Sequence, residues 1–330
     1  MSFEYRSVGF IGLGAMGKPM AEHLAKKLPS ETLIYVFDVV QAAIDQLCTE
    51  FPNKVVKSAN AKDLAEKSDI IVTMVPEGAQ VKSVYLDPQT GICSTDVSKK
   101  LLIDCSTIDT ATSLLVKDHI YQNFPTASFY DAPVSGGVVG AVKGTIAIFL
   151  GCSESDTNLP RLTHLLQMMG KSVIPCGGPS LGLAAKLSNN YLSGIIAIAA
   201  SEAFDMGMRS GLDPRVLQKV YAAGTAQNTI CDKFTPVPGV YAEAPSSNEY
   251  KNGFKVQLMR KDFGLAVDMA RRVGSRNVLG EVGLKTYTDA MNDPRCRDLD
   301  SRVIYRFLGG NEDWKGKDGI DHWDLHHQRT

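Results

Sequence analysis

Polar side chains begin an otherwise apolar stretch, KLSNNYLSGIIAIAASEAF, at residues 186–204. On a helix, four of them follow the spacing i, i+3, i+4 and i+7 and share one face: Lys186, Asn189, Asn190 and Ser193. An ammonium group in an apolar segment is costly unless it is compensated or loses its proton. A lysine that loses its proton near neutral pH can serve as a general base. In isolation the pattern favours a solvated lysine at a helix start, and an acid/base at Lys186 becomes the better interpretation together with a nucleotide-binding domain and an anion-binding loop.

A glycine-rich segment, GFIGLGAMG at residues 9–17, has the spacing of a phosphate-binding turn. Its glycines fit the pattern G-x-G-x-x-G between a β-rich run and a helical run. Such glycines permit a tight turn and a close backbone approach, and the helix that follows offers N–H groups to a pyrophosphate. The predicted cofactor-binding loop comprises Gly12, Leu13, Gly14, Ala15, Met16 and Gly17.

Asp38 favours a dinucleotide as the ligand of this loop, because it ends the run YVFD 21 residues after Gly17. A carboxylate at this position can accept hydrogen bonds from both ribose hydroxyls and would repel a 2′-phosphate. The expected cofactor is therefore NAD and not NADP. The alternative is an ordinary glycine turn with a helix-capping or solvated Asp38.

A second glycine-rich segment, DAPVSGGVVGAVKG at residues 131–144, also follows a β-rich run. Ser135, Gly136 and Gly137 offer one hydroxyl and backbone N–H groups without side chains, which suits a carboxylate or an oxyanion. In isolation, these three residues are more typical of a turn with positive φ. Thr107, in DCSTIDT, is a candidate cofactor contact, and helix capping is its alternative.

The elements that would position these residues alternate along the first half of the chain. Short β-rich runs lie at 7–12, 33–38, 70–75, 101–105, 129–134 and 145–151, with helical runs between them at 16–27, 40–51 and 110–123. Nearly continuous apolar strands in alternation with helices predict an α/β fold, a Rossmann-type doubly wound parallel sheet. Beyond residue 175 the pattern is helical, and its first helix is expected at 181–209. We therefore expect an NAD-binding domain at 1–175 and an all-helical substrate-binding and oligomerisation domain at 176–330, joined by this long helix.

Composition excludes several classes of protein. The 330 residues suit two domains, and a hydrophobic fraction of 44% with 22% charged residues is ordinary for a globular protein. A net charge of −1 gives no electrostatic reason to expect nucleic acid or an anionic membrane as a partner. The seven cysteines are scattered without a C-x-x-C pair, so neither a disulfide framework nor a metal site is expected. No apolar run reaches membrane-spanning length.

The motifs together resemble the β-hydroxyacid dehydrogenase family over nearly the whole chain. They are, in order, GFIGLGAMGKPMAEHL, DCSTID, DAPVSGGVVGA, GLAAKLSNN, PVPGV with PSSNEYKNGF, and KDFGLA. The PVPGV loop resembles the 3-hydroxyisobutyrate branch in particular, which implies NAD-dependent oxidation of that acid in valine degradation. The resemblance implies a catalytic acid/base at Lys186 held by Asn190, and a substrate-carboxylate loop at Ser135, Gly136 and Gly137. It also implies cofactor contacts at Val75, Pro76, Gln80, Thr107 and Lys261.

Two segments depart from the family pattern. Gln80 stands where an asparagine is expected, and residues 222–231, AAGTAQNTIC, stand where the animal enzymes of the family carry an Arg-Cys-Trp-Ser-like run, a candidate substrate contact. Glycerate or tartronate semialdehyde thus stays open as the substrate, as does a non-catalytic dinucleotide-binding role. The resemblance implies a mitochondrial protein, yet no presequence is visible, so the alternatives are a mature form or a cytoplasmic protein. The apolar helix at 181–209 predicts a homodimer or homotetramer.

Overall fold

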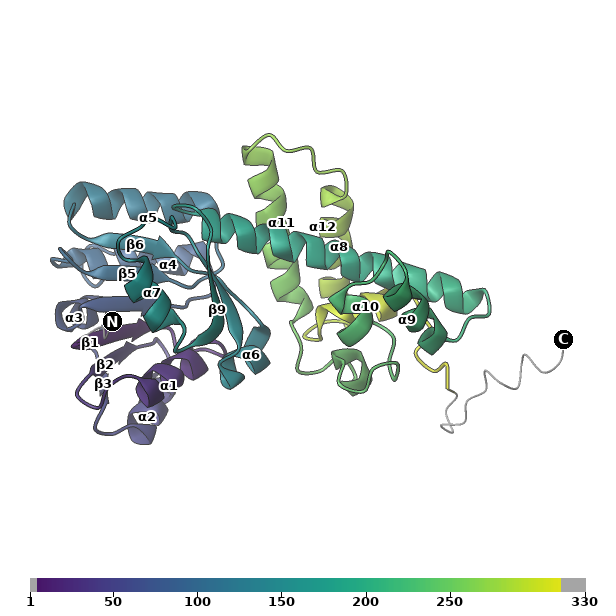
Figure 1. The fold of residues 1–330 in the computed structure, drawn as a ribbon, viewed down its shortest axis with the longest axis horizontal. Helices are drawn as coiled ribbons and strands as arrows, with labels where there is room; N and C mark the ends of the chain where they lie inside the picture. The colour runs from purple at the N-terminus through teal and green to yellow at the C-terminus, as the bar shows by residue number, and fades with distance from the viewer. Residues whose placement is uncertain (1–4, 316–330) are drawn as a thin grey trace. The chain divides into compact units, whose positions relative to one another are not determined.

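The structure is a computed structural model that describes residues 5–315 in two compact units, Met1–Lys186 and Leu187–Thr330. The first unit is a sheet with helices along both faces, and the second is built of helices (Figure 1). Helix α8 (Leu181–Arg209) contributes to both units. We propose that the boundary between the two domains lies near residue 175, ahead of this helix. Cleavage within 176–180 under limited proteolysis would support it, and cleavage only elsewhere would argue against it.

The main sheet has the strand order β3-β2-β1-β4-β5-β6, with every neighbouring pair parallel. Its strands are β1 (Ser7–Ile11), β2 (Leu33–Phe37), β3 (Val55–Lys57), β4 (Ile70–Thr73), β5 (Leu101–Asp104) and β6 (Ser128–Asp131). This order reverses between β1 and β4, and ligands of such sheets bind at the carboxyl ends of the strands at that switch point. The predicted doubly wound fold is confirmed.

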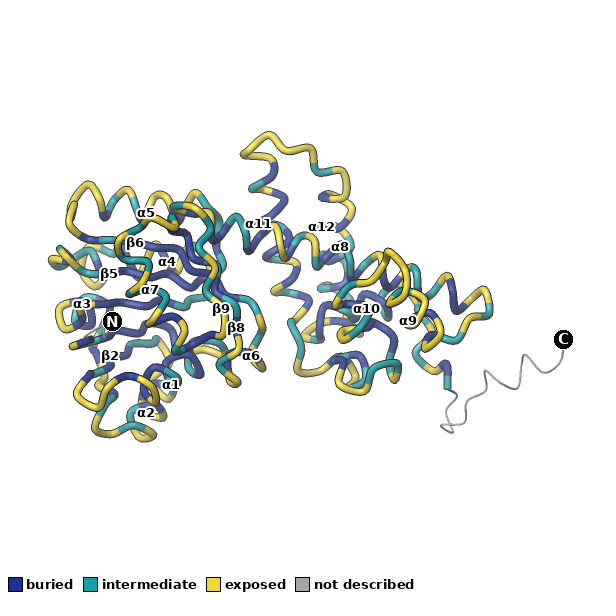
Figure 2. Tube along the Cα trace, viewed as in Figure 1, coloured by how far each residue is buried: buried dark blue, intermediate teal, exposed yellow. Residues whose placement is uncertain are grey.

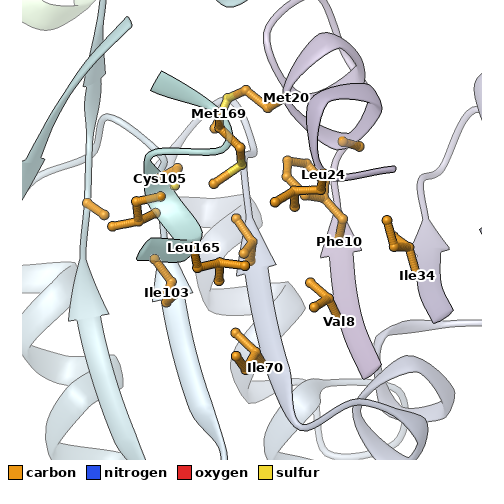
Figure 3. Close-up of a cluster of buried hydrophobic side chains, with 14 of the residues drawn as sticks. Val8, Phe10, Met20, Leu24, Ile34, Ile70, Ile103, Cys105, Leu165 and Met169 are labelled. Carbon is orange, nitrogen blue, oxygen red and sulfur yellow. The ribbon is translucent and has the colours of Figure 1, made fainter. Parts of the chain in front are cut away.

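The strands are apolar on both sides because both faces of the sheet are covered. In β4, Ile70 and Val72 join one hydrophobic cluster while Ile71 joins the other. The first cluster, drawn in part in Figure 3, packs the sheet against α1, α2 and α7, and the second packs it against α3, α4 and α5. The helices of this unit are α1 (Gly17–Lys27), α2 (Gln41–Glu50), α3 (Ala61–Lys67), α4 (Gly78–Leu86), α5 (Thr110–Asn123), α6 (Gly137–Lys143) and α7 (Leu159–Leu166), with a 3₁₀ turn η1 (Ile92–Ser94). Figure 2 shows the central strands β1, β4 and β5 buried and the outer turns of these helices exposed.

A second sheet of three strands lies beside the first, in the order β7-β8-β9. Its strands are β7 (Val134–Ser135), β8 (Ile146–Leu150) and β9 (Gly170–Pro175). The run at 145–151 does form a strand, β8, but it pairs antiparallel with β7 and parallel with β9 instead of extending the main sheet. An apolar run of this length looks the same in either sheet, so the pattern alone does not choose its partner.

The second unit is helical, as predicted. It contains the rest of α8, then α9 (Pro214–Ala223), α10 (Thr229–Lys233), α11 (Val256–Arg272), α12 (Gly280–Asn292) and α13 (Ile304–Phe307), with 3₁₀ turns η2 (Pro245–Asn248) and η3 (Ser301–Val303). Helix α8 approaches α11 closely at Gly194, where a Cβ would lie 2.8 Å from the Phe263 ring. No helix within residues 5–315 combines the length and the apolarity that a bilayer crossing requires.

Large apolar side chains stand exposed on the helices of the second unit. Leu192 and Met206 on α8 are 58% and 67% exposed, and Val282 on α12 is 67% exposed. Burial of such side chains between copies removes apolar surface from water. We propose that this unit self-associates, and we expect light scattering at micromolar concentration to give the mass of a dimer or a tetramer. A stable monomer at that concentration would contradict the proposal.

Candidate functional site

The glycine-rich turn after β1 requires glycine, for steric reasons, at two of the three glycine positions of the pattern G-x-G-x-x-G. Gly12 has a φ of +95°, and a Cβ there would lie 2.2 Å from the carbonyl oxygen of Met74 at the end of β4. A Cβ at Gly17 would lie 1.9 Å from the carbonyl oxygen of Gly12. The turn is therefore closed on itself and against the neighbouring strand, which aims the start of α1 across the switch point.

Gly14 differs from these two glycines, since a Cβ there would meet no atom within 4 Å. Gly14 and Ala15 are exposed, whereas Leu13 packs into the core beneath them. Helix α1 has no side-chain cap, and its first turn contains no acidic residue. An open approach to the backbone beside an uncapped helix start fits a dinucleotide pyrophosphate, so the residues present suit the predicted cofactor.

Asp38 follows β2 and is tied to this turn. One carboxylate oxygen accepts a hydrogen bond from the N–H of Leu13 at 2.5 Å, and the other accepts one from the N–H of Val40 at 2.7 Å. The carboxylate thus stands beside the glycine-rich turn, at the distance along the chain where a ribose hydroxyl is expected. Its negative charge there disfavours a second phosphate on the ribose.

The loops after β4 and β5 meet through one hydrogen bond, from the N–H of Val75 to the Ser106 hydroxyl at 2.9 Å. Pro76 and Gln80 are exposed and Thr107 is partly buried. The cap of α5 is Asp109, which accepts a hydrogen bond from the N–H of Thr112 at 2.8 Å. The capping alternative for Thr107 is therefore wrong, and a cofactor contact at this residue stays a prediction.

A buried polar cluster beneath these loops was missed from the sequence. The Asp104 carboxyl accepts hydrogen bonds from the Thr73 hydroxyl at 2.8 Å and from the N–H of Ser106 at 3.1 Å. The Thr73 hydroxyl also lies 3.1 Å from that of Tyr85. Ser106 is fully buried and holds Val75, so it supports the loops from below. The one signal in the sequence was that the apolar strands β4 and β5 end in the polar residues Thr73 and Asp104.

The Asp104 carboxyl predicts a pH-dependent stability. Burial raises its pKa to about 6, above the value of 3.8 it has in an unfolded chain. Its contribution is therefore complete below pH 3.8 and is lost as the pH rises through 6. Relative to Asp104→Asn, the wild type should lose about 1 kcal/mol of unfolding free energy between pH 5 and pH 8. Urea unfolding at both pH values checks this, and a pH-independent difference would contradict it.

The second glycine-rich loop begins at β7 with Ser135, which is partly buried. Gly136 and Gly137 have φ values of +137° and +62°, a region that disfavours other residues. A Cβ at Gly137 would meet no atom within 4 Å, so its backbone is open to an approaching group. This geometry suits both a tight turn and a carboxylate-binding loop, and the substrate contact stays a prediction.

Two of the four residues on the predicted polar face of α8 are buried, whereas Asn189 is exposed and Ser193 is partly buried. Lys186 is 6% exposed and Asn190, one turn later, is 5% exposed. The side-chain amide of Asn190 donates a hydrogen bond to the carboxylate of Asp262 on α11 at 2.7 Å. Asp262, also buried, forms an ion pair with Lys261 at 3.3 Å. Asp262 thus fixes the amide orientation of Asn190, a role that its place in an amphipathic helix did not reveal.

The structure brings several predicted residues together within the first unit. The glycine-rich turn, Asp38, Val75 and Thr107 all lie at carboxyl ends of neighbouring parallel strands. Lys261 belongs to the second unit, so its expected cofactor contact stays a prediction.

The comparisons with known proteins cover nearly all of the chain. Residues 7–178 match the family described as the NAD-binding domain of 6-phosphogluconate dehydrogenase. Residues 181–308 match the family described as the NAD-binding domain of NADP-dependent 3-hydroxyisobutyrate dehydrogenase. A probable mitochondrial 3-hydroxyisobutyrate dehydrogenase of Dictyostelium discoideum is 39% identical over 93% of this chain and 92% of its own length.

Two further relatives differ in what their names report. An NAD-dependent L-serine dehydrogenase of Pseudomonas aeruginosa is 33% identical over 86% of this chain and 91% of its own length. The solved structure of a Mycobacterium tuberculosis 3-hydroxyisobutyrate dehydrogenase with L-serine has a TM-score of 0.84 and 30% identity. It covers 92% of this chain and 99% of the other.

Proposed function

This chain belongs to the β-hydroxyacid dehydrogenase family and is an NAD-dependent dehydrogenase, and we propose that its own reaction is the oxidation of 3-hydroxyisobutyrate to methylmalonate semialdehyde. The names of the relatives support an enzyme that acts on a hydroxyl-bearing carbon of a small acid. The choice among such acids is the part we propose.

In the proposed mechanism, Lys186 accepts the proton of the substrate hydroxyl. Asn190 orients this amine, and Asp262 fixes the side-chain amide of Asn190 by accepting its hydrogen bond. The Ser135 hydroxyl and the N–H groups of Gly136 and Gly137 bind the substrate carboxylate. The glycine-rich turn and Asp38 would hold NAD, which would supply the acceptor for the hydride of the hydroxyl-bearing carbon.

One observation carries this proposal above the others: the burial of Lys186 one turn before an equally buried Asn190. A lysine that serves only solubility keeps its ammonium group in water. A buried amine beside an amide of fixed orientation suits proton transfer, for which the reacting groups must be within hydrogen-bond reach. The surface-lysine alternative does not account for this burial.

L-serine is a second candidate substrate, because it appears in the names of two relatives. It shares the 3-hydroxy acid skeleton and differs at the second carbon, which carries an amino group instead of a methyl group. Glycerate, which carries a hydroxyl group at the second carbon, also stays open as a substrate, as does its oxidation product tartronate semialdehyde for the reverse reduction. The segment at 222–231, which departs from the family pattern, begins in α9 and ends in α10 around an exposed loop.

Steady-state rates with a panel of small hydroxy acids test both the substrate and the cofactor. We expect the highest kcat/KM with 3-hydroxyisobutyrate and NAD, since the Dictyostelium relative is named for that acid. We expect a clear preference for NAD over NADP, because Asp38 repels the 2′-phosphate. A higher kcat/KM for L-serine would replace the substrate assignment, and a preference for NADP would refute the role of Asp38.

We also propose a mitochondrial location, which the name of the Dictyostelium relative supports. A cytoplasmic location is the alternative. Fractionation of cells that express the full-length protein separates the two, and recovery in the cytosol alone would refute the mitochondrial assignment.

A further inference from the structure

Asp131, the last residue of β6, is a buried carboxyl that receives the start of α8. It is 1% exposed. One oxygen accepts a hydrogen bond from the N–H of Ser180 at 2.6 Å, and the other accepts one from the N–H of Leu183 at 2.8 Å. These N–H groups belong to the first turn of the helix, which has no intrahelical acceptors for them. Asp131 therefore caps the longest helix of the chain from a strand 49 residues earlier.

Two glycines let this carboxyl and the helix come together. A Cβ at Gly151 would lie 1.9 Å from an Asp131 carboxyl oxygen, and one at Gly182 would lie 2.9 Å from the other. The Gly182 Cβ would also lie 2.2 Å from the carbonyl oxygen of Phe149 in β8. No side chain fits at either position, so the helix start is seated directly on the ends of β6 and β8.

The contact with Asp131 accompanies a constrained backbone at Ser180, the residue just before α8. Its φ is +64°, a value that residues other than glycine adopt at a cost. The Ser180 hydroxyl is also bound, to the carbonyl oxygen of Thr110 at 3.2 Å. Burial raises the pKa of Asp131, and the N–H groups of Leu183, Ser180 and Gly182 oppose this rise. The short bond from the Ser180 N–H accompanies the strained conformation and holds it in place.

The two segments of the proposed substrate site both begin near the contact between Asp131 and the start of α8. Lys186 lies three residues after Leu183 on α8, and Ser135 lies four residues after Asp131. We propose that Asp131 is a positioning residue that fixes the amine of Lys186 relative to the substrate-carboxylate loop. This inference rests on the proposed function, in which these two parts of the first unit hold one substrate. An error of about 1 Å in such an alignment can cost about 10²-fold in rate.

The test is Asp131→Asn, which replaces one carboxylate oxygen by an amide NH2 group that cannot accept a hydrogen bond from an N–H. We expect kcat, expressed per NAD-binding site, to fall by about 10–100-fold. The dissociation constant of NAD should stay within about twofold, because its predicted loops follow β1, β2, β4 and β5. Reductive methylation of Lys186, followed by mass spectrometry, should be several-fold faster than in the wild type, because the buried amine becomes accessible.

Asp213→Asn is the matched control, since Asp213 caps α9 through the N–H of Arg215 at 2.7 Å. Asparagine can keep the cap but loses the ion pair of Asp213 with Arg215, so the melting temperature should fall only slightly, and kcat and Lys186 methylation should stay within about twofold. The proposal is overturned if Asp131→Asn changes kcat and methylation no more than this control does. If Asp131→Asn yields no protein that binds NAD, Asp131→Ser takes its place with the same expectations, because one hydroxyl oxygen on a shorter side chain replaces the two carboxylate oxygens that hold the two N–H groups.

Methylation separates the two proposals. A wild type that oxidises no hydroxy acid would refute the proposed function, whereas the methylation ratio would still decide whether Asp131 positions Lys186. A wild type that is active, with an Asp131→Asn variant equal to it in kcat and in methylation, would refute the positioning role alone.

Discussion

Lys186→Arg is expected to lower kcat by about 10²–10⁴-fold, the usual contribution of a positioned proton-transfer group. Guanidinium keeps its proton at neutral pH and cannot serve as a base, so the conservative change should fail nearly as badly as Lys186→Ala. NAD affinity should barely change, since the amine acts on the substrate hydroxyl. Steady-state kinetics measure kcat, and NAD binding and thermal melting serve as controls for intact folding.

The surface-lysine alternative predicts a different outcome for the same variant. Arginine in place of a solvated lysine should leave turnover within about twofold and the unfolding free energy within about 0.5 kcal/mol. Near-wild-type turnover of Lys186→Arg would therefore remove Lys186 from the mechanism. A variant that melts early and binds no NAD would be replaced by Lys186→Met, which keeps the length of the side chain without its charge.

Gly12→Ala is expected to lose both stability and NAD binding. The added Cβ would lie 2.2 Å from the carbonyl oxygen of Met74, and alanine disfavours a φ of +95°. The turn must shift away from β4, at a cost of at least about 1–3 kcal/mol in unfolding free energy. Because the shift displaces the N–H groups that face the pyrophosphate, the dissociation constant of NAD should rise by more than about tenfold.

Gly14→Ala is the matched control for this effect, because its Cβ would meet no atom within 4 Å. Its unfolding free energy should stay within about 0.5 kcal/mol of the wild type. Its NAD affinity should still fall by about tenfold or more, since the methyl group stands where the pyrophosphate approaches. Unchanged NAD affinity in Gly14→Ala would contradict this placement of the cofactor. Unchanged stability in Gly12→Ala would contradict the packing of the turn against β4.

Local patterns predicted much of the fold and part of the candidate site. The glycine-rich turn and α8 are defined by residues close together in the sequence, where spacing and periodicity determine the conformation. The sequence therefore placed α8 at 181–209, as the structure has it. Lys186 and Asn190 share a face for the same local reason, since they lie one turn apart.

The features that sequence analysis missed depend on contacts between distant segments. Asp262 lies 72 residues from Asn190, and only their hydrogen bond shows that a carboxylate orients the amide. Ser106 stands beside Thr107 in the loop segment DCSTIDT, yet it is buried, and its hydroxyl holds Val75 31 residues away. The sheet of β8 was also misassigned, since pairing with β7 and β9 is a long-range choice. Periodicity carries no information on such partners.

The most direct test of the proposed reaction is whether deuterium passes from the labelled substrate to NADH. In the proposed reaction, hydrogen leaves the hydroxyl-bearing carbon of 3-hydroxyisobutyrate and reaches the nicotinamide without exchange with water. The substrate deuterated at that carbon, mixed with NAD and the wild-type protein, should give NADH that contains one deuterium by mass spectrometry, and Lys186→Arg should give almost none in the same time. Formation of unlabelled NADH, or of no NADH from any small hydroxy acid in the panel, would contradict the account.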